Sequence, residues 1–458
     1  MKCSSLAQPY KKLQNLVNSF FLILSFISLF LILHIEKQYF THYVYSTIIC
    51  IKSYFKKGDY MKDTKTWKMI LSGIFALVAV MGISRFAYTP IISFMEKQAH
   101  VEEDLAGYLA SSNYLGYLLG AFFIGLITIK NREKVLHHCL FFNVLSTLCM
   151  GVPSQIYFWF PLRFIGGFTS AIVFVLASSI VLDYLFHRNK VVLSGMIYSG
   201  VGIGIIFAGV FAPLFNSFWN WQGAWLGLGL ISFSLAIFVW KWLKEDTKHT
   251  EQKSKVPSIH TNHRKNYLFW LILAYGFEGF GYIITGTFLV MIVERMTHSL
   301  FYASWSWIIV GIAVIPSSYL WSSLAQKYGT TRTLTFAYIL QMISILSPLL
   351  LPNVLGSFLS ALFLGGTFVG ITILTTTEAK RIQPNESNKI IGYTTGVYGI
   401  GQIIGPILTG VIAKQTDSFF FPLLIAALTL FIAILLLFIG EIRCKQAAKN
   451  SLSVQDSL

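Results

Sequence analysis

Apolar segments of about 20 residues recur along this 458-residue chain, and they restrict its possible folds more than any other feature. Hydrophobic residues make up 55% of the chain and charged residues only 12%, whereas a soluble domain carries about 25% charged residues. An α-helix needs about 20 apolar residues to cross the hydrocarbon core of a bilayer. Backbone polar groups find no water there, so separate apolar segments must satisfy them as helices. The sequence therefore predicts an all-α, polytopic membrane protein whose partner is the lipid bilayer.

From residue 68 onward, the apolar segments divide into twelve expected transmembrane helices. The first six cover residues 68–94, 104–127, 138–152, 156–184, 192–215 and 221–243. The second six cover residues 267–293, 302–325, 333–351, 354–377, 390–413 and 418–440. A polar, basic stretch, residues 244–266, is expected to be a cytoplasmic linker. We therefore expect two six-helix bundles, residues 61–243 and 267–440, and a cytoplasmic tail, residues 441–458.

A glycine pattern recurs in the fifth helix of each expected half. Gly200, Gly204 and Gly209 match, at one constant interval, a second set in the eleventh helix, namely Gly401, Gly405 and Gly410. Glycines at this spacing let helix backbones approach closely. Glycine is also common in membrane helices, which is the simpler explanation of the match. Its recurrence at the same place in both halves favours parallel six-helix repeats around a central site, as in secondary transporters.

The net charge of +16 is distributed unevenly. Most Lys and Arg residues fall in the tails and in the loops on one side, and only Lys97, Arg295 and Lys414 fall on the other. By the positive-inside rule both ends of the twelve-helix unit are expected to be cytoplasmic. The basic residues thus predict how the protein is oriented in the membrane. They give no reason to expect a nucleic-acid partner. The five scattered cysteines support neither a disulfide framework nor a metal site, and we expect no cofactor and a monomer.

Residues 1–60 differ in pattern from the rest. Their apolar run, "NSFFLILSFISLFLIL" at 18–33, is short for a transmembrane helix. The residues before Met61, "KKGDY", back-translate to a purine-rich stretch compatible with a ribosome-binding site. We interpret residues 1–60 as an extension and Met61 as the true start, with an extra N-terminal helix or anchor as the alternative.

Three ionisable residues stand well inside expected helices: Arg85, Arg163 and Glu278. Such residues are costly in a bilayer and usually mark function. By the helical rise, Glu278 lies about 16 Å from the inner end of its helix, near mid-membrane. The two arginines lie in the outer half.

Glu278 belongs to a polar stripe on one helix face, together with Tyr275, Tyr282 and Thr285. Desolvation disfavours the charged form of a carboxylate and a nearby cation favours it. A conformational change that alters either could load and unload a proton, so Glu278 is predicted to couple transport to protons. The alternative is a fixed hydrogen bond to a neighbouring helix.

The remaining candidates are predicted to bind substrate. Arg85 could hold a carboxylate or phosphate through charge-assisted hydrogen bonds, and its alternatives are an internal ion pair or a side chain that reaches the interface. Asn113 and Gln402 could equally be hydrogen-bonding contacts between helices. The predicted substrate-binding residues are Arg85, Tyr88, Thr89, Asn113, Arg163, Tyr282 and Gln402. No catalytic residue is predicted.

Several motifs in this arrangement resemble those of the major facilitator superfamily. Arg163-x-x-x-Gly167 is similar to that family's fourth-helix arginine–glycine motif. "GQIIGPILTG" from Gly401 is similar to its glycine–proline antiporter motif, which usually marks the fifth helix, where Ile205 stands in place of the proline. "SRFAYTPII", "AGYLASSNYLGYLLGA" and "RFIGGFTSAIVFVLASSIVLD" together resemble the YbfB-like bacterial branch.

The resemblance covers about Met61 to Glu441 and implies the major facilitator fold. It also implies alternating access around a cavity lined by helices 1, 4, 7 and 10. One departure concerns the loop signature of the family, where Ile129 and Gln326 stand in place of an acidic residue. Gating by that loop is therefore not expected to follow the family pattern.

These observations together predict a secondary transporter for a small organic anion, coupled to protons through Glu278. One alternative is proton-antiport efflux of drugs or metabolites, with Glu278 holding a cation. A more distant alternative is a polytopic membrane enzyme, which would need carboxylates or histidines clustered at one membrane face. No such cluster is evident in the sequence.

Overall fold

The computed structural model describes residues 63–127, 129–152, 155–245, 264–383 and 387–455. These residues form helices and no strand, which confirms the all-α class. Thr66–Leu458 form one compact unit. The apolar run at 18–33, the expected start at Met61 and most of the expected linker lie outside the described residues. The division into two six-helix bundles stays a prediction.

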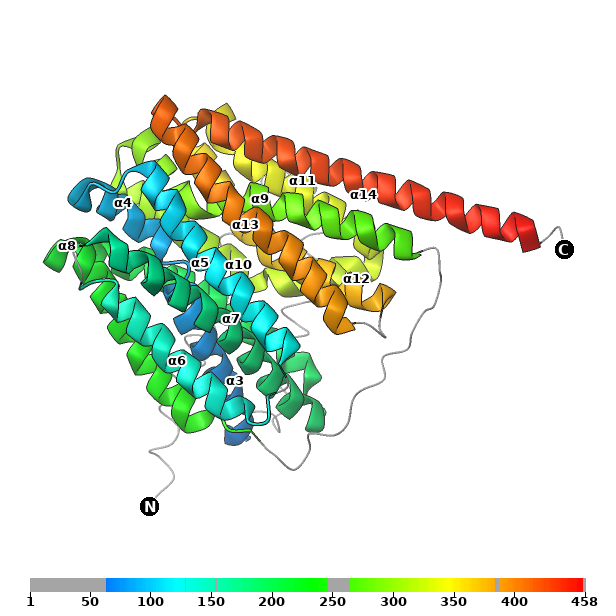
Figure 1. The fold of residues 1–458 in the computed structure, drawn as a ribbon, viewed down its shortest axis with the longest axis horizontal. Coiled ribbons are helices and arrows are strands. Elements are labelled where there is room, and N and C mark those ends of the chain that lie inside the picture. The colour runs from blue at the N-terminus through cyan, green and yellow to red at the C-terminus, as the bar shows by residue number, and fades with distance from the viewer. Residues whose placement is uncertain (1–62, 128, 153–154, 246–263, 384–386, 456–458) are drawn as a thin grey trace, which may run out of the picture. The chain divides into compact units, whose positions relative to one another are not determined.

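Helices of very different lengths follow one another along the described chain (Figure 1). In order they are α3 (Thr64–Leu77), the π-helix η2 (Val78–Ile83), α4 (Tyr88–Ala99), α5 (Glu103–Leu126), α6 (Arg132–Cys149), α7 (Ile156–His187), the 3-10 helix η3 (Val191–Tyr198), α8 (Ser199–Trp242), α9 (Arg264–Thr297), α10 (Leu300–Tyr328), α11 (Thr330–Leu350), α12 (Val354–Ile382), α13 (Ser387–Thr416) and α14 (Phe420–Gln455).

Ten stretches of the described residues are long and apolar enough to cross a membrane. One of them, Leu193–Trp242, covers two of the expected helices. The two are separated by a kink at Trp219 and Asn220 inside α8, where the backbone is not helical. Helix α6 occupies the place of the third expected helix but is outside the ten, since its first turn carries Arg132, Glu133 and Lys134. The helices match the expected positions, and the count of twelve crossings stays a prediction.

The first expected helix, residues 68–94, is not continuous. It passes from α3 into η2 and then into a turn at residues 84–87 before α4 begins. Two backbone N–H groups reach back five residues, from Ser84 to Ala79 O (2.9 Å) and from Phe86 to Met81 O (3.0 Å). Pro90 contributes to the break because it has no N–H and its ring excludes the carbonyl four residues earlier. Broken membrane helices occur where backbone is sheltered by protein, often at binding sites.

The close helix approach predicted from the glycine pattern is observed. A methyl group added at Gly82 would lie 2.2 Å from Gly204 Cα, so the first helix and α8 touch through their backbones. In the second half, a methyl group at Gly401 would lie 2.5 Å from Gly276 O of α9. Each half therefore packs its fifth helix on its first in the same way.

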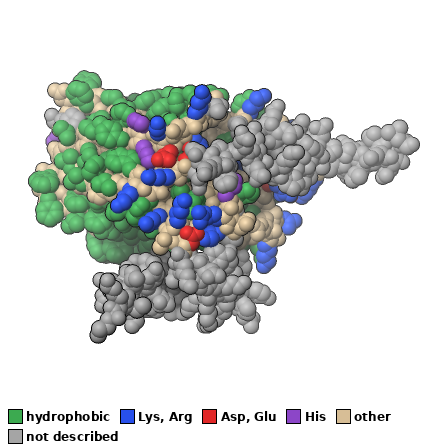
Figure 2. Space-filling model, turned by 90° about the horizontal axis from the view of Figure 1, so that it is seen from below, with side chains coloured by type: hydrophobic (Ala, Val, Ile, Leu, Met, Phe, Trp, Pro, Cys, Tyr) green, Lys and Arg blue, Asp and Glu red, His purple; other side chains and the backbone are tan. Residues whose placement is uncertain are grey.

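Contacts between the halves are made chiefly by α5 with α13 and by α8 with α10. Figure 1 shows α5 and α13 lying side by side. A methyl group at Gly107 of α5 would lie 2.2 Å from Pro406 O of α13, so these helices also touch through their backbones. Figure 2 shows Lys and Arg side chains gathered on one face and bordered by hydrophobic ones, in keeping with the uneven charge. The orientation of the termini stays a prediction.

Candidate functional site

Arg85 lies at the break in the first helix, between η2 and α4, and is buried with 4% of its surface exposed. Aromatic rings surround its guanidinium. The guanidinium carbon lies 4.0 Å from the ring centroid of Tyr117, 5.1 Å from Tyr114 and 5.5 Å from Phe86. The partly negative faces of such rings attract a cation, but the rings carry no net charge that would neutralise it.

A chain of hydrogen bonds joins Arg85 to the second half. Arg85 Nη2 donates to Gln402 Oε1 at 3.3 Å, and Gln402 Nε2 donates to the hydroxyl of Tyr282 at 2.5 Å. Gln402 lies on α13, Tyr282 lies on α9, and both are buried. The structure thus brings together three of the predicted substrate-binding residues, across the interface between the halves.

Parallel aromatic rings continue from Tyr282 within the second half. Its ring is stacked on Phe368 of α12 and on Tyr398 of α13, each at 5.8 Å between centroids. Tyr398 is stacked in turn on Tyr275 at 4.2 Å. These buried rings form a parallel stack that joins α9, α12 and α13, and the hydroxyl of Tyr282 connects the stack to Arg85 through Gln402.

No carboxylate of the described residues forms an ion pair with Arg85, and its Nε has no hydrogen-bond partner. A buried charge without an opposite charge is costly. A carboxylate bound at Arg85 would therefore remove an existing penalty as well as add an attraction.

Arg163 is buried inside the first half. Its Nη1 donates to Ser84 O at 3.1 Å, at the break in the first helix. Its guanidinium carbon lies 4.3 Å from the ring centroid of Tyr88 and 5.9 Å from that of Trp225 on α8. Arg163 therefore supports the segment that carries Arg85. Its Nε and Nη2 have no partner, and its contact with substrate stays a prediction.

Three further candidates make hydrogen bonds between helices. Tyr88 donates to Ala106 O (2.8 Å) and Thr89 donates to Gly286 O (2.8 Å). Asn113 Nδ2 donates to Arg163 O (2.8 Å), while its Oδ1 has no partner. In this conformation these side chains hold helices together, which is the alternative role given above for Asn113. Their contacts with substrate stay predictions.

Glu278 on α9 is fully buried, and neither carboxyl oxygen makes a hydrogen bond of ordinary geometry. The side-chain amide of Gln341 on α11 lies near enough for a weak hydrogen bond to the carboxyl group, although the contact falls outside ordinary hydrogen-bond geometry. The described residues place no cation in an ion pair with Glu278. Protein encloses the side chain completely, and its proton-coupling role stays a prediction.

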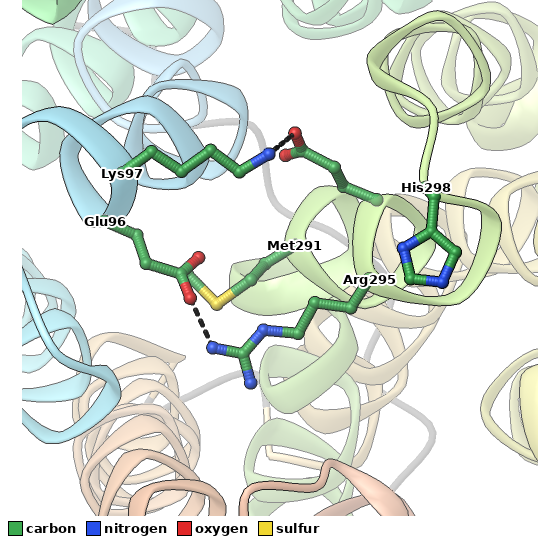
Figure 3. Close-up of a pocket in the computed structure, with 6 residues that line it drawn as sticks. Glu96, Lys97, Met291, Arg295 and His298 are labelled. Carbon is green, nitrogen blue, oxygen red and sulfur yellow. Dashed lines mark hydrogen bonds and ion pairs between the residues drawn. The ribbon is translucent and has the colours of Figure 1, made fainter.

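Ion pairs that the sequence analysis did not predict join the halves at the expected outer end. Lys97 of α4 pairs with Glu294 of α9, and Figure 3 shows Arg295 of α9 paired with Glu96 of α4. Arg295 also pairs with Glu103 at the start of α5. The two acid–base dipeptides, Glu96-Lys97 and Glu294-Arg295, occupy the same place in each half, and this repetition was the signal available in the sequence.

A cavity of about 370 Å³ lies among these ion pairs. Its lining residues are Glu96, Lys97, Met291, Glu294, Arg295 and His298. Lys414 at the end of α13 pairs with Glu102 and Asp104 near the start of α5. Acidic and basic groups alternate here, so the region favours closure between the halves. Among the described residues, no group of three His, Cys, Asp or Glu side chains is placed to hold a metal ion.

The chain shares sequence with known transporters. The family described as "Uncharacterised MFS-type transporter YbfB" matches residues 77–438. Over 100 residues the chain is 32% identical to the "Uncharacterized MFS-type transporter YceJ" of Bacillus subtilis, a match that covers 22% of this chain and only 26% of that relative. Over 347 residues it is 21% identical to a "Gentisate transporter" of Corynebacterium glutamicum, covering 72% of this chain and 78% of that protein.

Solved structures of the nucleoside transporter NupG share the fold. One has a TM-score of 0.64 at 15% identity and covers 83% of this chain and 99% of its own. A mutant of the same transporter has a TM-score of 0.65 at 16% identity, with coverage of 82% and 99%. At these identities the likeness shows the fold alone. The match across residues 77–438 shows the family, and the chain belongs to the YbfB-type MFS transporters, which are multi-pass membrane proteins.

Proposed function

We propose that this chain is a secondary active transporter that carries a small organic anion across the bacterial cytoplasmic membrane, coupled to protons. The observation that carries the proposal is Arg85, a buried guanidinium with no acidic partner among the described residues. It lies at a helix break, at the interface between the two halves.

An anion fits this site better than a neutral or cationic solute. The hydrogen bonds of a guanidinium to a carboxylate are shorter and about twice as strong as neutral ones. A cation beside Arg85 would add like-charge repulsion in a site of low dielectric. The relative that is named as a gentisate transporter supports the same class, since gentisate is a small organic anion.

Alternating access requires the halves to separate at one membrane face at a time. The ion pairs of Arg295 and Lys97 hold the halves together at the expected outer end. The hydrogen bond from Thr89 to Gly286 O and that between Tyr114 and Thr287 (3.0 Å) join them deeper in the membrane. These contacts support a conformation closed toward the outside, from which opening must break them.

Glu278 is the proposed proton site. Gly276 and Gly279 beside it pack against Val397 and Tyr398 of α13, the helix that carries Gln402. Movement of α13 against α9 would change the hydration of the carboxyl group. Binding at Arg85 and proton release at Glu278 would then depend on the same helix contact.

The test is a thermal-shift screen of the purified protein with carboxylates (benzoate, pyruvate and succinate) and with lipophilic cations (tetraphenylphosphonium and ethidium). A ligand that binds only the folded state stabilises it by about 2.7 kcal/mol at a hundredfold excess over its Kd. We expect carboxylates to raise the Tm of the wild type and to lose this effect in Arg85→Gln. Arg85→Lys is the matched control, which keeps the charge but not the planar fork, and it should retain part of the shift.

Hits among the cations alone that vanish in Glu278→Gln would replace the proposal with proton-antiport efflux. Carboxylate shifts that are unchanged in Arg85→Gln would move the anion site away from Arg85.

A further inference from the structure

We infer that Gln402 is a placeholder for the substrate: its amide oxygen occupies the position on Arg85 that a substrate carboxylate takes, and leaves when substrate binds. This inference rests on the proposed anion transport. It differs from the expectation that Gln402 holds the substrate, because it makes Gln402 a competitor.

The orientation of the Gln402 amide follows from its two partners. Arginine offers only donors, so the amide oxygen must face Arg85 and the amide nitrogen must face away. That nitrogen donates to the hydroxyl of Tyr282, and the ring of Tyr282 is stacked on Phe368 and on Tyr398. The oxygen is thus presented to the guanidinium by a rigid support.

The bond that the oxygen makes is weak enough to be displaced. Its length is 3.3 Å, whereas a guanidinium–carboxylate hydrogen bond is typically about 2.7–2.9 Å. The amide is also neutral, so it leaves the charge of Arg85 uncompensated, and Arg85 Nε stays without a partner. A carboxylate that can bond two guanidinium nitrogens therefore replaces the amide.

The same contact spans the moving interface. Arg85 belongs to the first half and Gln402 to the second, 317 residues away. When the halves close without substrate, the guanidinium is buried in any case, and Gln402 supplies the acceptor that would otherwise be missing. Gln402 thereby allows the empty carrier to close and reorient, which net transport requires and exchange of substrate for substrate does not.

The first experiment uses Gln402→Leu, which removes the competing acceptor. Radiolabelled benzoate should bind about tenfold more tightly, since a hydrogen bond to a charged group is lost from the empty state only. In proteoliposomes, exchange against internal benzoate should persist while net uptake falls about tenfold or more, because the empty carrier closes over a bare cation. Weaker benzoate binding, or an equal fall in exchange and net uptake, would overturn the inference and make Gln402 a lasting substrate contact.

The second experiment needs no substrate. Gln402→Glu places a carboxylate on Arg85, so we expect a higher Tm than that of the wild type and no benzoate binding. The gain in Tm should disappear when Arg85→Gln is added. A Tm that is unchanged or lowered in Gln402→Glu, in a protein that still binds benzoate, would refute the placeholder. If the wild type binds no carboxylate at all, the proposed function fails, and these Tm values still decide whether Gln402 and Arg85 form the inferred contact.

Discussion

Glu278 combines full burial with the absence of a hydrogen bond of ordinary geometry to either oxygen, which few structural carboxylates show. If it carries the proton, Glu278→Gln should abolish accumulation of substrate against its gradient and spare exchange, because the amide cannot release a proton. Uptake into proteoliposomes with and without an imposed proton gradient measures both. Glu278→Asp is the matched control and should keep gradient-driven uptake. Undiminished accumulation in Glu278→Gln would assign the proton to another group.

Some residues of the candidate site could be predicted from the sequence and others could not, for a physical reason. Arg85 and Glu278 are visible because charge is rare in apolar segments. The rings of Tyr114 and Phe368 are not, because aromatic residues are frequent throughout this chain and do not mark a site by themselves. The contact of Arg85 with Gln402 depends on how two distant helices meet, and no local pattern encodes it.

Among the helices, the close contact of the first helix with α8 depends on Gly82 and Gly204. Gly82→Ala would place a methyl group 2.2 Å from Gly204 Cα, so backbone must move. Overpacking of this kind destabilises by about 1–3 kcal/mol, and the shift would displace the break that holds Arg85. We expect a lower Tm and weaker anion binding.

Gly366→Ala in α12 is the matched control, since nothing lies within 4 Å of an added methyl group there. It should leave the Tm unchanged or raise it slightly, because alanine favours helix. Equal losses of Tm and of anion binding in both variants would mean that the close contact of Gly82 with Gly204 does not require glycine at position 82.

The glycine contacts were predictable, whereas the break in the first helix was not. Proline is tolerated in membrane helices, and Pro161, Pro316 and Pro348 lie inside α7, α10 and α11. Pro90 alone therefore does not specify a break. At the break, the carbonyl of Ser84 accepts a hydrogen bond from Arg163 on another helix, and this tertiary contact is not encoded in the local sequence.

Across the whole molecule, the repeat predicted from glycines extends to charges. Glu96-Lys97 and Glu294-Arg295 exchange partners between the halves, so each base pairs with the acid of the other half. The order of the long apolar helices was readable from hydropathy. The repeated acid–base dipeptides were also visible in the sequence, but the partners that they take were not, because the pairing requires both halves to be closed on each other in one conformation.

The outer ion pairs differ in burial. This difference predicts which of them contributes more to keeping the protein closed toward the outer face of the membrane. The Lys97 side chain is 61% exposed, so its pair contributes about 0–1 kcal/mol. Arg295 is 32% exposed and holds both Glu96 and Glu103, and hydrogen bonds between charged groups contribute about 1.5–3 kcal/mol. Arg295→Gln should therefore favour opening to the outside far more than Lys97→Gln.

Labelling with a membrane-impermeant maleimide would measure this opening at Met291→Cys, which lines the cavity and is 1% exposed. The five native cysteines would first be replaced by serine. We expect the labelling rate to rise about tenfold in Arg295→Gln and little in Lys97→Gln, the matched control. If neither variant is labelled faster than the protein that carries Met291→Cys alone, these ion pairs do not hold the outer side closed. Closure would then rest on the backbone contacts of α5 with α13.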